Sequence, residues 1–579
     1  MGINLPGWQP RDWVAPLEPW TTSYNVVVVG GGLSGCAAAI AAGRRGARVV
    51  LIEPTHMLGG QMTVGGVGTI DYAPGFRTSV EQGLWGEIVR RIRTIYKAYG
   101  ITASVARYRL NDSLAVNAPV GDRVLTELCD GAGVEILRNC TVQSASVTDT
   151  GVRLETTAGT ITGSVAVEAT EDGSLLAMAD FPFRAGNKIG RGWSLSGAPA
   201  NIQRFTQCGV LRRYDHGVPP QLQLHIPPPG YTDMLPALHK VFPYRTSYPP
   251  GSTKSTNDFA GYRAYPDIAD LVNYDALDWA DIRRTSVNSS NDVQITTDYL
   301  SDAAYRRDQT TTALYRTLGI IYFLQNDVGV NWAVAQDEGF AEGPKLRTLG
   351  VTPDMPSWVT DFPVNVYLRE SRRLIGAYTL TAKRIDRAPA NTPATWSAQA
   401  LALGTYGIDM HGSKEPGDFE TDLGESIADV DINDFGPFAI PFGSFVPKDN
   451  RRLVAAEKNL SMSRIVSGSV RVHPSVTAVG EAAGVVAALA WKQGVAPRVV
   501  SYQAAQISLL KHGALLLPYP VYGIPVGHRD YPAVALAVLN KKVSYRIDNV
   551  TNTLRLTSSQ LSAAKSIGAK LLASWKGPL

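Results

Sequence analysis

Residues 24 to 63 read YNVVVVGGGLSGCAAAIAAGRRGARVVLIEPTHMLGGQMT, and this stretch decides the fold. It opens with four valines, Val26 to Val29, a β-branched run typical of a strand buried on both faces. The glycine-rich segment GGGLSG follows at 30–35, and an alanine-rich helix is expected over 34–45. A second strand is expected over 48–52. This order predicts a βαβ unit with a glycine-rich turn after its first strand.

The glycine-rich turn has the spacing G-x-G-x-x-G. Gly30 would make the tight turn, Gly32 would let the backbone approach a pyrophosphate, and Gly35 would let the helix pack closely on the strand. Ser34 lies in the first turn of the helix, whose positive end would face the phosphates. Glu53 stands 18 residues beyond the last glycine, where a carboxylate can accept a hydrogen bond from a ribose 2′-hydroxyl and would repel a 2′-phosphate. These features predict a bound dinucleotide; a tight turn without a ligand is the alternative.

A second glycine pair distinguishes FAD from NAD. Gly59 and Gly60 follow Glu53 closely, and Gln61 and Thr63 add polar side chains next to them. An NAD domain has no need of this second point of backbone approach, so the pattern favours FAD. The alternative is a flexible glycine-rich loop.

Length and composition limit the number of domains and the classes of partner that we expect. The 579 residues are enough for two or three domains, and 55 basic residues are scattered among 51 acidic ones with a net charge of +4. There is no run of five like charges, so we expect no nucleic-acid binding. The first residues contain no apolar signal-peptide core, and we expect no membrane span. A cytoplasmic protein is expected, although a leader already removed would leave no trace in this chain.

The four cysteines, Cys36, Cys129, Cys140 and Cys208, include no C-x-x-C pair. This spacing argues against dithiol chemistry, a disulfide framework and a metal site.

Residues 140–170 alternate apolar and polar side chains in three pieces that are separated by turns, which indicates a β-meander. Val142 lies in its first piece. The meander ends in a buried strand, 165–167, and the segment ATEDG, 169–173, follows and contains Ala169 and Asp172.

With this order of elements the chain resembles the glutathione-reductase-like flavoproteins, and more closely the FAD-dependent oxidoreductase family. Four segments carry the resemblance: LGGQMTVGGVG from Leu58, ATEDGSLLAMA from Ala169, YLRESRRLIGAYTLT from Tyr367 and RVHPSVTAVGEAAGVVAALA from Arg471. The resemblance covers about residues 24 to 495. The chain departs from the family pattern at Glu171, at Ser174 and at EKN, 457–459, where many relatives have a glycine-rich segment.

The resemblance implies an α/β fold with FAD as cofactor. We expect a Rossmann-like FAD-binding domain, a parallel sheet with a β-meander, built from 24–182 and 440–500, and an inserted α+β substrate domain at 183–439. An N-terminal arm, 1–23, and a C-terminal helical cap or tail, 501–579, complete the chain, and the tail is also a candidate contact between subunits of a homo-oligomer. The predicted FAD-binding residues are Gly30, Gly32, Ser34, Gly35, Glu53, Gly59, Gly60, Gln61, Thr63, Val142, Ala169, Asp172, Gly480 and Ala483.

The last two of these residues belong to a helix expected from about residue 475. Its small residues would leave room for the planar flavin ring, and its N-terminus would stabilise the reduced flavin. The alternative is a small-residue helix packed closely on another helix. Arg471 and His473 lie just before it, where they reach either the flavin or the substrate; a solvated pair is the simpler interpretation.

Asp409 and His411 are two residues apart in YGIDMHG, and on a strand both would face the same side. A carboxylate that orients an imidazole near the flavin suits proton transfer, so Asp409, His411, Arg471 and His473 are the catalytic candidates. A purely structural histidine is the alternative.

Three further groups are candidates for ligand contact. The charged cluster Arg369, Glu370, Arg372 and Arg373 would anchor an anion or form a buried structural ion-pair network, and the network is favoured. The polar loop with Asn288, Asn291 and Asp298 would contact a ligand or satisfy its own turns. His56 is a candidate for covalent flavin attachment.

The sequence therefore predicts an FAD-dependent oxidase or dehydrogenase that removes a hydride from a C–OH or C–N carbon of a small polar molecule. A second dinucleotide motif is not evident, so oxygen or another acceptor is expected to reoxidise the flavin. The alternatives are a flavoenzyme for a net non-redox isomerisation or elimination, and a non-catalytic interaction protein that keeps an FAD fold.

Overall fold

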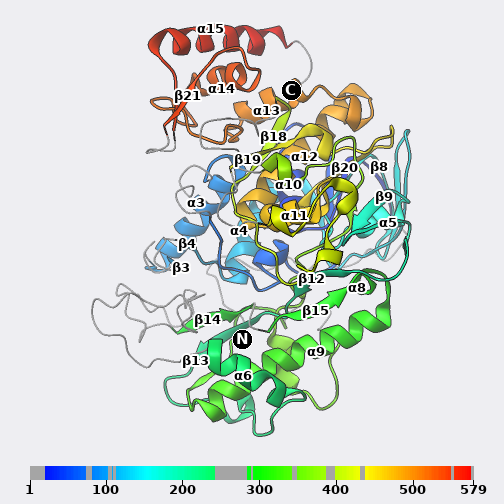
Figure 1. The fold of residues 1–579 in the computed structure, drawn as a ribbon, viewed down its shortest axis with the longest axis vertical. Coiled ribbons are helices and arrows are strands. Elements are labelled where there is room, and N and C mark those ends of the chain that lie inside the picture. Colours follow the sequence, from blue (N-terminus) through cyan, green and yellow to red (C-terminus); the bar gives the residue numbers. More distant parts are fainter. Residues whose placement is uncertain are drawn as a thin grey trace.

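The structure is a computed structural model, and it describes residues 20–72, 81–101, 107–108, 113–241, 283–288, 291–341, 349–385, 398–430, 437–548 and 553–575. The described part has three regions along its longest axis (Figure 1). The sheet that contains the glycine-rich turn lies in the middle, a region from the centre of the chain lies below it, and the C-terminal helices lie above. Most of the predicted N-terminal arm falls outside the described residues.

The central sheet is the βαβ unit that the sequence predicts, extended on both sides. Its strands lie in the order β5-β2-β1-β8-β7-β6, with β20 paired to β8 as well. Strands β5, β2, β1, β8 and β20 are parallel, and β6, β7 and β8 form the antiparallel meander. The strands span Trp20–Val29 (β1), Val49–Ile52 (β2), Val134–Leu137 (β5), Val142–Val147 (β6), Val152–Thr156 (β7), Gly159–Glu168 (β8) and Leu453–Ala455 (β20). Because β1 begins at Trp20, residues 20–23 of the predicted arm belong to the sheet.

Two helices with small side chains cross next to this sheet. Helix α1, Leu33–Gly43, follows β1, and helix α12, His473–Gln493, packs against it. A methyl group at Gly480 would lie 2.0 Å from the carbonyl oxygen of Ser34, and one at Gly484 would lie 2.1 Å from that of Ala38. The glycines of α12 therefore allow two helix backbones to touch.

Helices α3, Gly83–Ala98, and α4, Ala118–Gly131, complete this layer. Helix α12 is the one described helix long and apolar enough to cross a membrane, and 89% of its most apolar window is buried inside the protein.

The inserted region below the sheet has its own hydrophobic core, formed by residues between Leu211 and Phe362. Its core includes Trp332, Phe323 and Leu318, and residues from 368 onward pack into the main core instead. The elements are β12 (Asn201–Phe205), β13 (Gly209–Arg213), α6 (Tyr231–Val241), β14 (Arg284–Val287), β15 (Val293–Thr296), α8 (Asp298–Ser301), α9 (Ala303–Tyr322) and β16 (Trp332–Val334). The domain boundaries at 183 and 439 remain a prediction.

Two small sheets lie outside the central sheet. One has the order β11-β10-β9-β17 and the other pairs β18 with β19. Their strands span Pro182–Ala185 (β9), Lys188–Arg191 (β10), Ser194–Leu195 (β11), Arg373–Leu374 (β17), Ala400–Gly404 (β18) and Phe438–Pro441 (β19). The short helices are α5 (Ser174–Met178), α10 (Ala382–Ile385) and α11 (Arg464–Val470).

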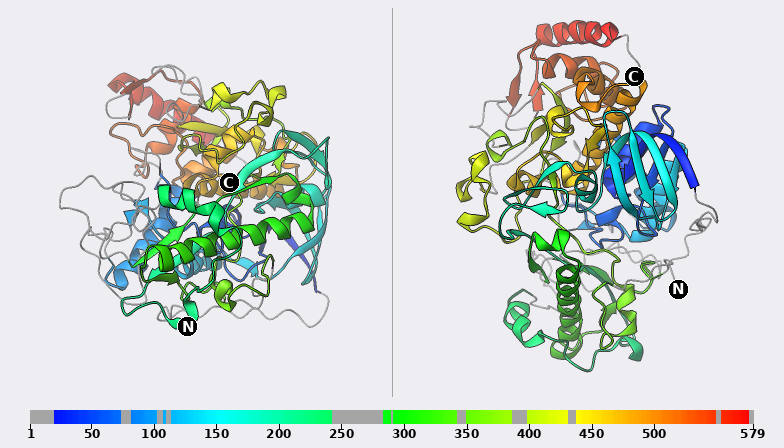
Figure 2. Two further views of the ribbon diagram at one scale, coloured as in Figure 1. Left: turned by 60° about the horizontal axis from the view of Figure 1, so that its bottom comes forward. Right: turned by 90° about the vertical axis from the view of Figure 1, so that its right-hand side faces the viewer.

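The C-terminal part, seen at the top of both Figure 1 and the right-hand view of Figure 2, is mostly helical. The last helix begins at a capping box, because the side chain of Thr557 accepts the N–H of Gln560 and the side chain of Gln560 accepts that of Thr557. Its elements are α13 (Tyr502–Lys511), α14 (Tyr531–Leu539), β21 (Arg546–Asp548), β22 (Thr553–Arg555) and α15 (Ser558–Ser574).

One local expectation is wrong, because Asp409 to His411 lie in a loop after β18 and not on a strand. Tertiary contacts of the charged side chains in this segment override its local propensity.

Candidate functional site

A cavity of about 350 Å³ opens at the carboxyl ends of β1, β2 and β8. Ligands bind at this edge of parallel sheets, because the turns after the strands meet there. Seven of the predicted cofactor residues line the cavity: Gly30, Gly32, Glu53, Gly60, Val142, Ala169 and Asp172.

Glycine is required at the turn itself. Gly30 has φ +100°, and a methyl group on it would lie 2.3 Å from the carbonyl oxygen of Ala169. A methyl group on Gly35 would lie 1.8 Å from the carbonyl oxygen of Gly30. The roles predicted for these two glycines, a tight turn and close helix packing, are therefore present in the structure.

Glu53 is buried at the end of β2 and bonds to the turn. Its Oε2 accepts the N–H of Gly31 at 2.7 Å, and its Oε1 accepts the N–H and hydroxyl of Thr55 at 2.8 and 2.6 Å. Burial raises the pKa of Glu53, although the bonds from Thr55 and Gly31 act in the opposite direction. The carboxyl group thus fixes the backbone of the turn and lines the cavity at the same time.

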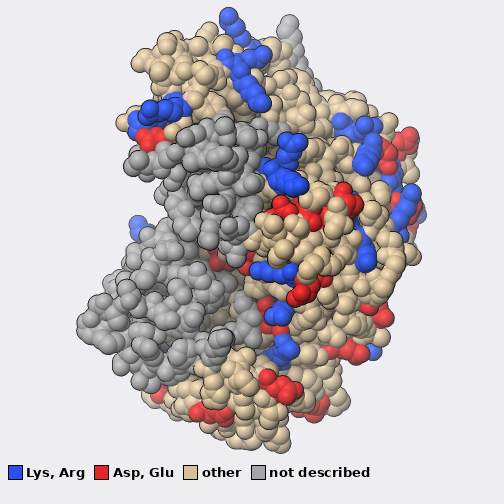
Figure 3. Space-filling view, in the orientation of Figure 1, with Lys and Arg blue, Asp and Glu red and all other residues tan. Residues whose placement is uncertain are grey.

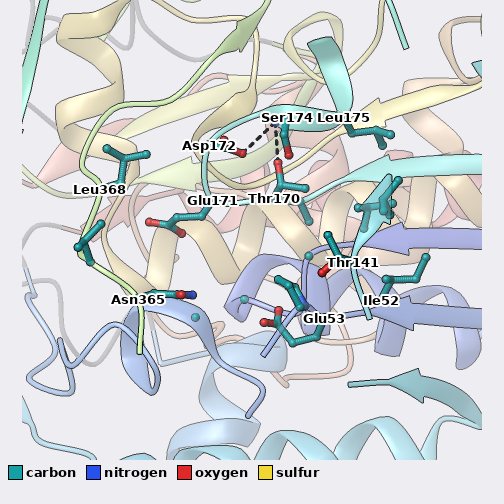
Figure 4. Close-up of a pocket in the computed structure, with 18 of the residues that line it drawn as sticks. Ile52, Glu53, Thr141, Thr170, Glu171, Asp172, Ser174, Leu175, Asn365 and Leu368 are labelled. Carbon is teal, nitrogen blue, oxygen red and sulfur yellow. Dashed lines mark hydrogen bonds between the residues drawn. The ribbon is translucent and has the colours of Figure 1, made fainter. Parts of the chain in front are cut away.

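The opposite wall of the cavity comes from the inserted region and the segment after it. Figure 4 shows Asn365 and Leu368 across the cavity from Glu53 and Thr141. Tyr299, Leu300, Arg306, Thr310 and Leu349 also line it. The cavity is therefore closed by two parts of the chain that are far apart in sequence.

Charged side chains surround the end of β8. Asp172 faces Arg372 at 3.4 Å and Arg306 at 3.8 Å, and despite burial these cations lower its pKa. Lys458 is buried and contacts Glu171 at 2.8 Å and Glu457 at 3.4 Å. Burial raises the pKa of Glu457 to about 7, and the two carboxylates raise the pKa of Lys458 against the effect of its burial.

A second charged cluster surrounds His411. Its Nδ1 lies 2.8 Å from Oδ2 of Asp292, and its Nε2 lies 3.3 Å from Oδ2 of Asp409. Arg471 donates to the same Asp409 oxygen at 2.8 Å and also to the hydroxyl of Tyr367. Burial would raise the pKa of Asp409, but the bond from His411 and the charge of Arg471 outweigh it and hold the pKa well below its usual value.

This cluster adjoins the glycine-rich loop after β2. Gln61 donates from Nε2 to the carbonyl oxygen of Arg471 at 2.9 Å, and Nε2 of His473 lies 2.8 Å from the carbonyl oxygen of Val67. The start of α12, the loop 59–67 and the His411 cluster are thus one connected unit.

The comparisons with known proteins agree with this geometry. A family model described as FAD dependent oxidoreductase matches residues 25–509. The chain belongs to this family. No curated protein matches the chain.

Solved structures align with parts of the chain. Thioredoxin reductase from Lactococcus lactis in its FR conformation aligns at 19% identity and a TM-score of 0.17, over 25% of this chain and 35% of that one. NikD, an amino acid oxidase essential for nikkomycin biosynthesis, aligns at 16% identity and a TM-score of 0.23, over 34% of this chain and 59% of that one. L-amino acid deaminase from Proteus vulgaris aligns at 13% identity and a TM-score of 0.24, over 35% of this chain and 57% of that one. The chain thus spans about a third to three fifths of the length of these proteins. These similarities do not identify its substrate.

The cavity residues fit the FAD of this family. The turn at Gly30 has no room for a side chain, the N-terminus of α1 supplies a positive end for a pyrophosphate, and the Glu53 carboxyl group suits ribose hydroxyls. Thr141, Leu175 and Met178, which line the same cavity, were missed because nothing in their spacing marks them.

The structure assigns other roles to several predicted FAD residues. Ser34 is buried and accepts the N–H of Glu457 at 2.8 Å, and the hydroxyl of Thr63 donates to the carbonyl oxygen of Leu58 within its own loop. Gly480 touches α1 rather than leaving room for the flavin, and Ala483 is fully buried in the same helix. The alternative weighed for this helix, close packing on another helix, is correct for Gly480.

Gly59 and Gln61 do not line the cavity either. Gly59 has φ +112° and forms a bridge with Gly32, which brings the second glycine pair against the first turn. This contact lets Gly60 reach the cavity.

The predicted ion-pair network is present. Arg373 contacts Glu420 at 3.0 Å and Arg464 contacts Glu370 at 3.1 Å, and all four side chains are fully buried. Arg369 differs, because it contacts Asp292 at 3.0 Å and so belongs to the His411 cluster.

Other candidate ligand-contact residues have structural partners. Asn291 bonds to Thr206, Thr317 and the carbonyl oxygen of Gln207. Asp298 bonds to Thr296 at the start of α8, and Nε2 of His56 lies 2.9 Å from the carbonyl oxygen of Gly339. All four cysteines are free and buried, and the described residues contain no group of three or more His, Cys, Asp or Glu placed to hold a metal.

Proposed function

We propose that this enzyme removes a hydride from a C–OH or C–N carbon of a small polar substrate and passes the electrons to oxygen or another acceptor. The observation that supports this most directly is the bond between Gln61, in the loop next to the cofactor cavity, and Arg471, in the His411 cluster. It connects the cavity to a set of ionisable side chains at the start of α12.

FAD, when bound, supplies the group that accepts hydrogen and two electrons from the substrate carbon. The protein supplies orientation and charge. The ring of His411 lies between two carboxylates, and Asp409 is the most exposed of the charged residues of the cluster, at 39%. We assign substrate positioning and proton transfer to Asp409 and His411, and orientation of Asp409 to Arg471. His473 completes the first turn of α12 next to them.

The test is an anaerobic visible spectrum of the purified protein in the presence of alcohols, amines and sugars, followed by admission of air. Bleaching by one class and recovery in air would establish an oxidase and its substrate class, and bleaching without recovery would indicate a dehydrogenase. Substrate turnover without bleaching would favour a net non-redox reaction. A flavin that neither substrates nor dithionite reduce would favour a non-catalytic role and contradict the proposal.

A further inference from the structure

The charge of the cofactor cavity is unusual for a site that takes a pyrophosphate. Its described lining contains three carboxyl groups, those of Glu53, Glu171 and Asp172, and a single cation, Arg306. FAD brings a negative charge on each of its phosphates. The N-terminus of α1 offers backbone N–H groups and a partial positive charge of about half an elementary charge, which is less than the pyrophosphate carries. Among the described lining residues, only Arg306 can supply a full positive charge.

Two of the three carboxyl groups are paired with cations behind the cavity wall. Lys458 lies 2.8 Å from Glu171, and Arg372 lies 3.4 Å from Asp172. The side chains of Lys458 and Arg372 are 2% and 1% exposed, and neither residue belongs to the described lining. These two cations therefore balance carboxylates and are not presented to a ligand.

Arg306 is held in place and still has donors to offer. Its Nε donates to the carbonyl oxygen of Tyr299 at 2.8 Å, and its Nη2 donates to that of Leu300 at 2.7 Å. A guanidinium group has five N–H donors, two of them on Nη1. Nη1 of Arg306 donates to none of the described residues, and the side chain is 34% exposed. The guanidinium group is thus fixed through two nitrogens and free to bind through the third.

The segment after β8 lies between Arg306 and the glycine-rich turn. Asp172, in this segment, is 3.8 Å from Arg306. A methyl group on Gly30 would lie 2.8 Å from Cα of Thr170 in the same segment. Gly30, Gly32 and Arg306 all line one cavity of about 350 Å³. The turn before α1 and the helix α9, which carries Arg306, therefore border the same cavity from two distant parts of the chain.

We propose that Arg306 binds the pyrophosphate of FAD, so that the inserted region forms part of the cofactor site. Guanidinium groups recognise phosphate oxygens through parallel N–H···O bonds, and such charge-assisted bonds are about twice as strong as neutral ones. The glycine-rich turn and α1 supply the backbone part of the phosphate site, and α9 supplies its cation. This inference rests on FAD as the cofactor and not on the reaction proposed above.

The experiment measures competition for the cofactor site of the FAD-loaded protein. The protein is diluted until part of its FAD dissociates, and adenosine or ADP is added at constant ionic strength. The fluorescence of the released flavin then gives an inhibition constant for each compound. ADP carries the two phosphates and adenosine carries none. In the parent protein we expect ADP to bind at least about tenfold more tightly than adenosine.

The variant Arg306→Gln removes the charge and keeps a polar side chain. FAD and ADP should each bind at least about tenfold more weakly to it, and the affinity for adenosine should not change. Arg306→Lys, which keeps the charge, should recover part of the advantage of ADP over adenosine. Arg44→Gln is the matched control, because the side chain of Arg44 is also 34% exposed and pairs with Glu87 outside the described lining of the cavity. It should bind all three compounds as the parent protein does.

Four results would overturn the inference. The first is equal binding of ADP and adenosine by the parent protein, and the second is unchanged affinity of Arg306→Gln for FAD and ADP. A parallel loss of ADP and adenosine affinity would show that Arg306 only supports the fold. A loss for FAD without a loss for ADP would move the contact to the flavin side of the cofactor. None of these measurements involves oxidation of a substrate, so the proposed reaction stands or fails separately.

Discussion

Glu425 shows how a single buried carboxyl group couples the stability of this protein to pH. Its Oε1 accepts the N–H of Ala382 at 2.6 Å, and burial raises its pKa from 4.5 to about 7. Since the folded state binds the proton more tightly than the unfolded chain, the stabilisation is fully present below about pH 4.5 and is lost as the pH rises through 7. The full effect is on the order of 3 kcal/mol.

The side chain of Glu425→Gln is neutral at every pH. We therefore expect the melting temperature of this variant to fall less between pH 5 and pH 8 than that of the parent protein. Glu168 and Glu457, whose pKa values are also raised to about 7, remain in both proteins and contribute equally. Glu155→Gln, on an exposed pair with Arg153, should behave as the parent does. Identical pH profiles for parent and Glu425→Gln would contradict this prediction.

At the same scale, sequence spacing identifies some site residues and misses others. Glu53 was predicted because only 18 residues separate it from Gly35 within one βαβ unit, where local geometry sets its position. Asp292 was missed because it lies 119 residues from His411, and only the packing of the inserted region brings the two together. Tyr367 and Arg369 were quoted within a family segment, but their contact with the His411 cluster depends on the same packing.

At the scale of elements, the crossing of α1 and α12 determines how the cofactor turn is held. Because a methyl group at Gly480 would lie 2.0 Å from the carbonyl oxygen of Ser34, Gly480→Ala must push the helices apart. We expect a loss of about 1–3 kcal/mol or more and weaker FAD binding, since Ser34 belongs to the first turn of α1. The measurements are the melting temperature and an FAD titration of the apoprotein.

Gly131→Ala is the control for this experiment. Gly131 ends α4, and a methyl group there would meet no atom within 4 Å. Its substitution should leave both measurements close to those of the parent protein. If Gly480→Ala were as stable as Gly131→Ala, the close contact of the two helices would be refuted.

Helices α1 and α12 also show what a sequence pattern does not predict, namely which group packs against a small-residue helix. The small residues of α12 predict that another group packs closely against this helix. Either a flavin ring or a second helix would satisfy that pattern, so the sequence does not distinguish them. The order of strands was simpler to predict, because the β-branched runs and the turns between them alternate at short range. Asp409 and His411 were expected on a strand because residues two apart face the same side there. Their side chains also come together in the loop that the structure shows, so the spacing does not distinguish a strand from a loop.

At the scale of the whole molecule, Glu338 fastens the inserted region to the FAD-binding part. It accepts the N–H of Ala118 at 3.0 Å, at the start of α4, the side chain of Asn117 at 2.8 Å, and Arg284 at 2.6 Å. Helix α4 in turn carries Asp122, which accepts the N–H of Leu58 in the loop beside the cofactor cavity.

We expect Glu338→Ala to destabilise the protein by about 3 kcal/mol, because it leaves the start of α4 without its acceptor and removes a buried partner of Arg284. A lower melting temperature and weaker FAD binding should appear together. Asp215→Ala, which removes the partially exposed partner of Arg283, should cost less than about 1 kcal/mol. A loss in Glu338→Ala no larger than in the control would disprove the fastening role.

The pairing of β20 with β8 has a consequence for synthesis on the ribosome. Leu453 to Ala455 complete one edge of β8, whose partner residues Ala166 to Glu168 emerge about 290 residues earlier. At translation rates of roughly 5–20 residues per second, that edge waits about 15–60 s for its neighbour. Helix α12, which covers α1, arrives later still. During this interval the nascent chain exposes an open strand and an uncovered alanine-rich helix, so chaperones have their longest opportunity to bind it there.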